Sequence, residues 1–213
     1  MTPDLQSERM QEICSLAPVV PVLVIPDGAD AVALARALVD GGLPVLEVTL
    51  RTAGALDAIT RMAQVPGAVV GAGTVLTPED VWKAKEAGAT FAVSPGATGQ
   101  LISACIDEAL PLLPGAATAS EVMRAADAGF DMLKFFPAEP AGGVRYLKSL
   151  GGPLPHVGFC PTGGITVEKA PEYLSQPNIL CVGGSWIAPE SDILAGNWAA
   201  ITERARAAKA LRA

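Results

Sequence analysis

The chain has 213 residues, half of them hydrophobic, so it can bury one large core. Its formal net charge of −7 argues against nucleic acid or an anionic membrane surface as a partner, so local donors must hold any anionic ligand. The longest apolar run, residues 17–26, is interrupted by Pro18 and Pro21 and is too short to span a bilayer, and the acidic N-terminus is unlike a signal peptide. We therefore expect a cytoplasmic protein that does not enter membranes.

A helix is predicted over residues 3–17, where Pro18 ends it. Its buried face is expected to carry four apolar side chains: Leu5, Met10, Ile13 and Leu16.

Eight apolar runs of strand length then alternate with alanine-rich segments of helical period. The runs are residues 19–25, 44–50, 68–75, 90–94, 110–114, 132–136, 157–161 and 179–182. The helical segments include residues 29–40, 53–63, 78–87, 99–109 and 120–128. This alternation predicts a single domain over residues 1–213: an α/β fold in which a (β/α)8 TIM barrel follows the extra N-terminal helix. A doubly wound open sheet is the alternative.

Three glycines that end helical segments, Gly42, Gly88 and Gly129, mark a weak internal repeat. Five residues after the first and the last of them lie Glu47 and Lys134. Side chains of alternate barrel strands share a layer, so this count predicts that Glu47 and Lys134 lie at a similar height in the interior. A register shared by chance is the alternative.

Polar residues alternate along the second strand, with Glu47, Thr49 and Arg51 on the face that should point to the barrel axis. The guanidinium of Arg51 matches a carboxylate bidentately, and Glu47 in an apolar site could transfer protons. A structural ion pair between Glu47 and Arg51 is an equally simple interpretation.

The third strand ends in Gly71-Ala72-Gly73-Thr74, just before a helix start with Thr77 as N-cap and Pro78 at the first position. The glycines would let backbone approach a ligand, and Thr74 is a candidate hydroxyl for the carboxylate that Arg51 binds. The same glycines could simply relieve crowding in the barrel.

Lys134 lies within a predicted buried strand, Asp131 to Ala138, among apolar side chains. A charged amine is costly there, whereas a neutral amine is a nucleophile that attacks carbonyl carbons and forms Schiff bases. An ordinary ion pair, or a lysine reaching out from a strand end, is the alternative.

Strand ends supply the other candidates. Ser94-Pro95-Gly96 and Pro114-Gly115 are interpreted first as turns and then as pocket walls, and Pro137 is expected to end the sixth strand. The last two strands end in Gly163-Gly164 and in Gly184-Ser185, where backbone N–H groups and a hydroxyl suit a phosphate. Paired glycines could also be plain turns.

No metal site is expected, because His, Cys, Asp and Glu show no ligand spacing. The only histidine, His156, precedes the seventh strand, on the face opposite the expected site. The four cysteines lack C-x-x-C spacing and are expected to be buried free thiols; Cys160 and Cys181 are assigned to the core.

Six motifs together resemble the bacterial 2-keto-3-deoxy-6-phosphogluconate (KDPG) and 2-keto-4-hydroxyglutarate (KHG) aldolase family. They are Glu47-Val-Thr-Leu-Arg51, Gly71-Ala-Gly-Thr74, Ser94-Pro-Gly96, Lys134-Phe-Phe-Pro137, Cys160-Pro-Thr-Gly-Gly164 and Gly183-Gly-Ser-Trp186. The resemblance implies a Schiff base between Lys134 and pyruvate in the Entner–Doudoroff pathway, with Glu47 transferring protons. It also implies a homotrimer that needs no cofactor and no metal.

The resemblance further assigns the binding residues. Arg51 and Thr74 would hold the pyruvate carboxylate. The phosphate of a phosphorylated keto acid would lie at Gly163, Gly164, Gly184 and Ser185, and the pocket would be lined by Pro95, Phe136 and Thr162. The alternatives are an aldolase for KHG or for the galactonate epimer and, from another class, a non-catalytic sensor of phosphorylated sugar acids.

Overall fold

The structure is a computed structural model that describes residues 1–212, so residue 213, the end of the predicted domain, lies outside the described residues. The strands are β1 (Val19–Leu23), β2 (Val45–Thr49), β3 (Val69–Gly73), β4 (Phe91–Val93), β5 (Leu112–Leu113), β6 (Gly115–Ala116), β7 (Met132–Phe135), β8 (Gly158–Pro161) and β9 (Val182–Gly184). The helices are α1 (Pro3–Ser15), α2 (Ala31–Asp40), α3 (Ala55–Met62), α4 (Pro78–Glu86), α5 (Gly99–Asp107), α6 (Ala119–Asp127), α7 (Gly143–Gly151), α8 (Ala170–Leu174), α9 (Glu190–Ala195), α10 (Trp198–Lys209) and the 3₁₀ turn η1 (Ala210–Arg212).

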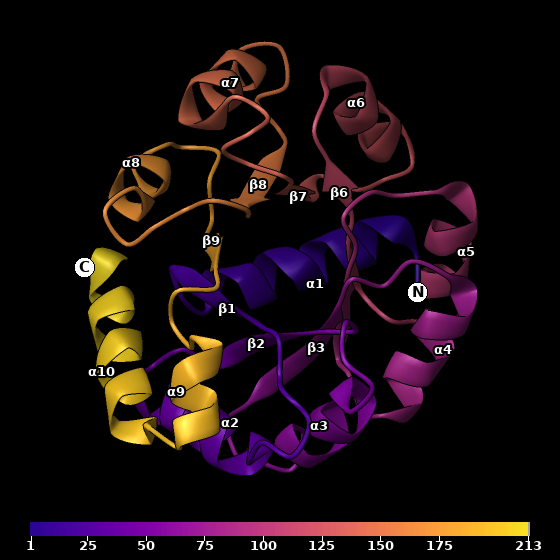
Figure 1. Cartoon of the computed structure of the whole chain (residues 1–213). Coiled ribbons are helices and arrows are strands. Elements are labelled where there is room, and N and C mark those ends of the chain that lie inside the picture. Colours follow the sequence, from indigo (N-terminus) through magenta and orange to yellow (C-terminus); the bar gives the residue numbers. More distant parts are fainter. Residues whose placement is uncertain (213) are drawn as a thin grey trace.

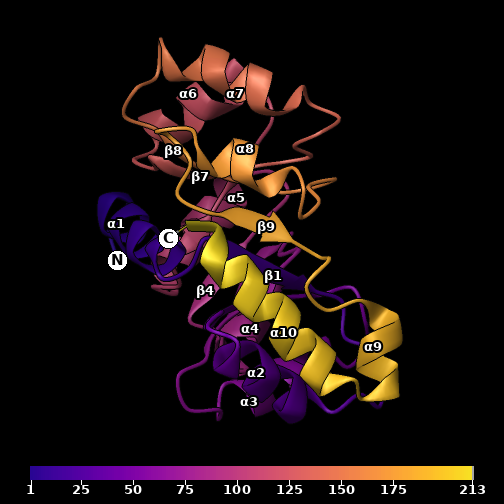
Figure 2. The same ribbon diagram turned by 90° about the vertical axis from the view of Figure 1, so that its left-hand side faces the viewer.

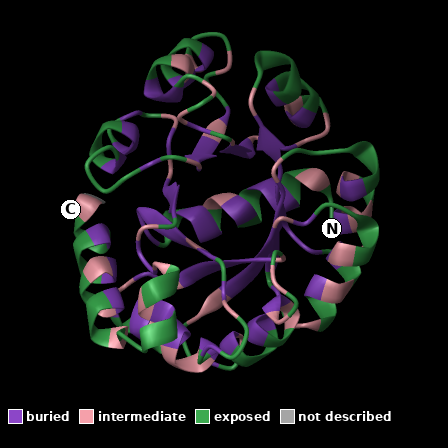
Figure 3. Cartoon of the chain, in the orientation of Figure 1, coloured by how far each residue is buried: buried purple, intermediate pink, exposed green. Residues whose placement is uncertain are grey.

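The strands pair in parallel in two sheets. One has the order β5-β4-β3-β2-β1-β9 and the other the order β6-β7-β8. Isolated parallel bridges join residues of the β8 region to the β9 region, at Phe159–Ile179 and Thr162–Gly183. The helices from α2 to α10 surround the curved strands, and Figure 3 shows buried residues on the sides of these helices that face the strands (Figures 1 and 3). The predicted α/β class and its alternation of parallel strands and helices are confirmed.

The predicted fifth strand, residues 110–114, differs from the structure because it divides at Pro114. Before the proline, β5 pairs with β4; after it, β6 pairs with β7. Proline has no N–H to donate, so the ladder to β7 begins at its carbonyl, which accepts from the Lys134 N–H at 2.9 Å. The chain thereby passes from one sheet to the other at the level of Lys134.

The helix-ending glycines of the internal repeat are confirmed. Gly42, Gly88 and Gly129 have φ of +87°, +94° and +89°, the left-handed conformation that a glycine adopts without steric cost. Thr77 also caps α4 as predicted, in a capping box with Asp80.

A buried cluster gathers side chains from most strands and from α1. Its members are Met10, Ile13, Cys14, Val20, Val45, Phe91, Val93, Leu113, Met132, Cys160 and Cys181. Strands from both sheets therefore enclose one apolar interior, and α1 contributes to it from one end, where Figure 2 shows the helix beside the strands. All four cysteines are buried thiols that form no disulfide bond, as predicted.

The predicted buried face of α1 is partly wrong. Met10 and Ile13 are buried, but Leu5 and Leu16 are 52% and 46% exposed. Two polar residues, Gln6 and Ser7, are buried instead. They are tolerated because they bind backbone groups near the starts of strands.

Hydrogen bonds from Gln6 and Ser7 attach α1 to the rest of the fold. The Gln6 amide donates to the carbonyl of Cys105 at 3.0 Å and accepts from the Leu112 N–H at 3.2 Å. The Ser7 hydroxyl accepts from the N–H groups of Asp131 and Met132 at 2.9 and 3.0 Å, and donates to the Asp131 carboxylate. A hydrophobic pattern cannot reveal such a polar helix face.

No helix among the described residues combines the length and the apolar character needed to cross a bilayer.

Ser7→Ala should lower the free energy of unfolding by about 1–3 kcal/mol, because it leaves buried backbone donors without a partner. Urea unfolding would measure the change. Ser15→Ala, which removes an exposed hydroxyl from the same helix, is the matched control and should stay within about 0.5 kcal/mol of the parent chain. Equal effects of the two substitutions would contradict the role given to Ser7.

Candidate active site

Lys134 and Glu47 meet in the interior from opposite strands. The Lys134 ammonium, on β7, donates to Oε1 of Glu47, on β2, at 3.0 Å. Both side chains are nearly inaccessible, with 7% and 4% exposed. The predicted common layer for these residues is confirmed. The buried ammonium of Lys134 therefore has a charged partner, which offsets the cost of its burial. A proton could pass directly between the two groups across the 3.0 Å contact.

The Phe136 ring is a second neighbour of the amine, with its centroid 5.4 Å from Lys134 Nζ. A ring face at this distance attracts an ammonium or iminium cation. The lysine therefore has a carboxylate and an aromatic ring as neighbours, both able to stabilise positive charge on the nitrogen.

Gly71 and Gly73 make room for larger side chains on neighbouring strands. A Cβ at Gly73 would lie 2.4 Å from Glu47 Oε1, and a Cβ at Gly71 would lie 2.3 Å from the Phe91 ring. Of the two interpretations of this G-x-G motif, the relief of crowding is the one that the structure bears out. At Gly73 that space is occupied by the Glu47 side chain itself.

Arg51 and Thr74 lie together just after the C-terminal ends of β2 and β3. The Arg51 Nε donates to Thr74 Oγ1 at 3.3 Å. Thr74 has φ of +60°, a left-handed backbone conformation that is rare for a β-branched residue. The extended strand β3 ends just before it, at Gly73. Among the described residues Glu47 forms its ion pair with Lys134 and none with Arg51, so the alternative of a structural Glu47–Arg51 pair is wrong.

The glycine-containing ends of β8 and β9 are neighbours. Gly163 and Gly164 have φ of +108° and +77°, and Thr162 bridges to Gly183. The hydroxyl of Thr162 fills the position of a Cβ at Gly183, at 2.2 Å. Ser185 is exposed beside this junction. The two segments predicted to bind an anion therefore lie side by side, and Gly184 itself is buried.

Gly184 has a packing explanation. A Cβ there would lie 2.3 Å from the Trp186 ring. The absence of a side chain at Gly184 therefore reflects its contact with Trp186, and only its backbone groups remain candidates for ligand binding.

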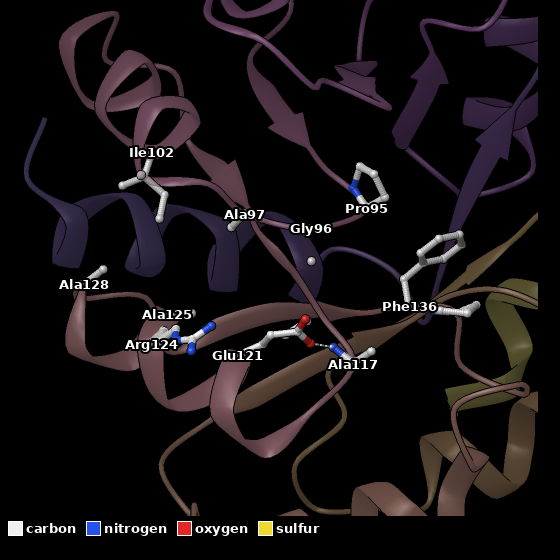
Figure 4. Close-up of a pocket in the computed structure, with 14 residues that line it drawn as sticks. Pro95, Gly96, Ala97, Ile102, Ala117, Glu121, Arg124, Ala125, Ala128 and Phe136 are labelled. Atoms are coloured by element: carbon white, nitrogen blue, oxygen red, sulfur yellow. Dashed lines mark hydrogen bonds between the residues drawn. The ribbon is translucent and has the colours of Figure 1, made fainter.

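A cavity of about 610 Å³ opens between α5 and α6 (Figure 4). Pro95 and Phe136 stand at one end of it, and Ile102 and Ala128 at the other. Two of the three predicted wall residues line this cavity, whereas Thr162 does not. Phe136 therefore lines this cavity and also lies near the amine of Lys134.

Cys160 lies beside Lys134 in the pairing of β7 with β8. Its hydrogen bond with Cys181, together with burial, raises the pKa of the Cys160 thiol well above the usual value. A protonated, buried thiol is a poor nucleophile, so Cys160 offers no competing nucleophile beside Lys134. No group of three or more His, Cys, Asp and Glu in the described part of the chain could hold a metal ion.

Sequence reasoning missed a polar cluster beside the glycine loop. Glu139, in the segment after β7, accepts from the Tyr173 hydroxyl at 2.5 Å and from the Lys169 ammonium. Tyr173 is otherwise buried on α8. Residues 30 and more positions apart form this cluster only after folding, so no local spacing signals it.

Comparison with known proteins identifies the family. The family model described as KDPG and KHG aldolase matches residues 10–204. The chain belongs to this aldolase family.

Relatives match over nearly the whole chain. The 2-dehydro-3-deoxy-phosphogluconate aldolase of Pseudoalteromonas atlantica is 51% identical over 201 residues, which are 94% of this chain and 94% of the relative. The crystal structure of the KDPG aldolase of Zymomonas mobilis with 3-phosphoglycerate has a TM-score of 0.93 and 52% identity, and it covers 97% of each chain.

A third relative bears on the chemistry of the family. The KDPG aldolase of Legionella pneumophila, with pyruvate captured at low pH as a covalent carbinolamine intermediate, has a TM-score of 0.91 and 46% identity. The match covers 93% of this chain and 97% of that one.

Gly73→Ala should reduce aldolase turnover roughly 10²-fold, as for a catalytic group moved by about 1 Å, because the new methyl would displace the Glu47 carboxylate. Steady-state kinetics would measure it. Gly152→Ala is the matched control: its φ of −65° suits alanine, and nothing lies within 4 Å of the added carbon. Full turnover by the Gly73 variant would contradict a need for Glu47 at this position.

Proposed function

We propose that the protein is a class I aldolase that cleaves 2-keto-3-deoxy-6-phosphogluconate to pyruvate and glyceraldehyde 3-phosphate. The observation that carries this proposal is the buried contact of Lys134 with Glu47 at 3.0 Å, in a chain that belongs to an aldolase family. A lysine in that position suits covalent chemistry on a keto acid.

The reaction begins with proton transfer from Lys134 to Glu47, which gives a neutral amine and a carboxylic acid. The amine attacks the C2 ketone of the substrate and forms a carbinolamine, as pyruvate does in the Legionella relative. Loss of water, for which Glu47 supplies the proton, leaves an iminium ion on Lys134 and returns Glu47 to the carboxylate form. The iminium nitrogen then lies over the Phe136 ring, which favours its positive charge.

The iminium ion makes carbon–carbon cleavage possible because its nitrogen can accept the electrons of the bond that breaks. Glu47, acting through a water molecule, removes the proton of the C4 hydroxyl as the C3–C4 bond breaks, and the bonding electrons flow to the iminium nitrogen. Glyceraldehyde 3-phosphate leaves first. The resulting enamine is protonated at C3 and hydrolysed, which releases pyruvate and restores the lysine amine.

Substrate binding is assigned to the strand ends around this pair. Arg51 and Thr74, joined at 3.3 Å, hold the carboxylate of the pyruvate portion. Backbone N–H groups of Gly163, Gly164 and Gly184, together with the hydroxyl of Ser185, bind the phosphate. Pro95, Phe136 and Thr162 form the walls between the two anionic ends.

We infer that the two sheets close into a single (β/α)8 barrel, with β5 and β6 as halves of one strand and α1 as the extra N-terminal helix across one end. The Phe159–Ile179 and Thr162–Gly183 bridges support this closure. The apolar cluster that unites both sheets with α1 supports it as well. A single domain over residues 1–213 is consistent with the matched range.

We also propose a homotrimer in the cytoplasm, on the basis of the family resemblance. Large apolar side chains are exposed on the side of the molecule where α4 and α6 lie: Leu76, Trp82 and Met123 (Figure 1). Contacts between copies would remove such surface from water.

The family description also names KHG, so cleavage of that unphosphorylated keto acid is the second candidate function. The glycine loops favour a phosphorylated substrate. Comparison of KDPG, its galactonate epimer and KHG as substrates would rank them.

Lys134→Arg should abolish cleavage without unfolding the protein, because arginine keeps the positive charge but cannot act as a neutral nucleophile. Borohydride reduction in the presence of pyruvate, followed by peptide mass spectrometry, should place a stable adduct on Lys134 of the parent chain. An adduct on a different lysine would refute the assignment.

Glu47→Gln should still permit imine formation but slow cleavage by roughly 10²–10⁴, the range for loss of a general acid–base group. Imine trapping and turnover, measured on the same preparation, should therefore separate. If both are lost to the same extent, Glu47 is needed to make Lys134 reactive, and its assigned role in cleavage is wrong.

A further inference from the structure

The loop that carries Gly163 and Gly164 is held against the segment after β7. The N–H of Ala138 donates to the Thr162 carbonyl at 2.8 Å, and the N–H of Glu139 donates to the Gly163 carbonyl at 3.0 Å. A Cβ at Gly164 would lie only 2.9 Å from Glu139 Cβ. Glu139 is therefore the acidic side chain that packs directly against the proposed phosphate loop.

A carboxylate is unfavourable beside a phosphate, yet the structure keeps Glu139 ionised. Hydrogen bonds from Lys169 and Tyr173 hold the pKa of Glu139 below its usual value. The Tyr173 hydroxyl stays protonated as a donor, because burial and the neighbouring Glu139 carboxylate raise its pKa. The Tyr173 hydroxyl gives the Glu139 carboxylate a hydrogen bond but no positive charge. Of its two partners, only Lys169 can neutralise the negative charge of Glu139.

Lys169 is also the only cation in the loops that follow the last three strands. Residues 137–142, 162–169 and 185–189 contain Glu139, Glu168 and Lys169 as their charged side chains. A dianionic phosphate bound in these loops would meet two carboxylates and one ammonium, in a protein whose net charge is −7. The charge balance of this region therefore depends on Lys169.

We propose that Lys169 is a specificity-determining residue for the phosphorylated end of the substrate. It cancels the charge of Glu139 across Gly164 and supplies the positive charge that the backbone donors lack. This role rests on the proposed placement of the phosphate at the glycine loops. It predicts an effect of charge on substrate choice, whereas a merely structural ion pair would affect every substrate alike.

The first test is Lys169→Met, which keeps the aliphatic stem and leaves Glu139 uncompensated. The KM for KDPG should rise roughly tenfold at low ionic strength, as expected for the loss of one unit charge within a Debye length of a dianion, while kcat changes little. The increase should shrink in 1 M salt, where the Debye length is about 3 Å. Kinetics with unphosphorylated KHG should stay nearly unchanged.

The second test restores the balance. Glu139→Gln keeps the hydrogen-bond acceptor for Tyr173 but removes the negative charge, so Glu139→Gln combined with Lys169→Met should recover most of the KM for KDPG. Lys85→Met, which breaks the Lys85–Glu108 pair between other elements, is the matched control and should leave both substrates unaffected. Urea unfolding would verify that each variant is folded.

The proposal is overturned if Lys169→Met affects KDPG and KHG equally, or if the double variant is as weak as Lys169→Met alone. Ser185→Ala, measured in parallel, separates this failure from a failure of the phosphate site. If Ser185→Ala impairs KDPG selectively and Lys169→Met does not, only the role of Lys169 is wrong. If neither variant discriminates between the substrates, the phosphate does not bind at these loops.

Discussion

The rest of the structure depends on keeping two ionisable side chains out of water, in contact with one another. Removing a carboxylate or an ammonium from water costs several kcal/mol, and only a close partner offsets it. Lys134 and Glu47 are that pair, 3.0 Å apart. The surrounding strands contain residues that leave room for the Glu47 side chain and that hold the backbone of Lys134 in place.

Gly73 leaves the volume that the Glu47 side chain occupies. Pro114 is where the chain changes sheets, and its carbonyl accepts the backbone N–H of Lys134. Beside the pair, burial and the contact with Cys181 raise the pKa of the Cys160 thiol, and apolar side chains fill much of the interior. The proton transfer that we propose between Lys134 and Glu47 would therefore take place next to a buried apolar cluster.

The sequence predicts the alternation of strands and helices, because apolar runs and alanine-rich periodic segments are local properties. It also predicts the shared layer of Glu47 and Lys134, because helix-ending glycines set the entry of alternate strands.

The sequence does not predict the polar buried face of α1. Gln6 and Ser7 are explained only by backbone groups that lie 99 and 124 residues further along the chain. The cluster of Glu139, Lys169 and Tyr173 is hidden for the same reason. The glycines at 71 and 73 are open to two interpretations, and only the positions of Phe91 and Glu47 decide between them.

The central claim is that Lys134 and Glu47 work as one proton-transferring unit on an imine of pyruvate. The most direct measurement is the exchange of pyruvate methyl hydrogens in deuterated water, followed by NMR, because exchange requires both the imine and proton transfer at C3. The account predicts exchange by the parent protein, none by Lys134→Arg, and a rate at least about 10²-fold lower for Glu47→Gln. Exchange at the parent rate in Glu47→Gln would contradict it.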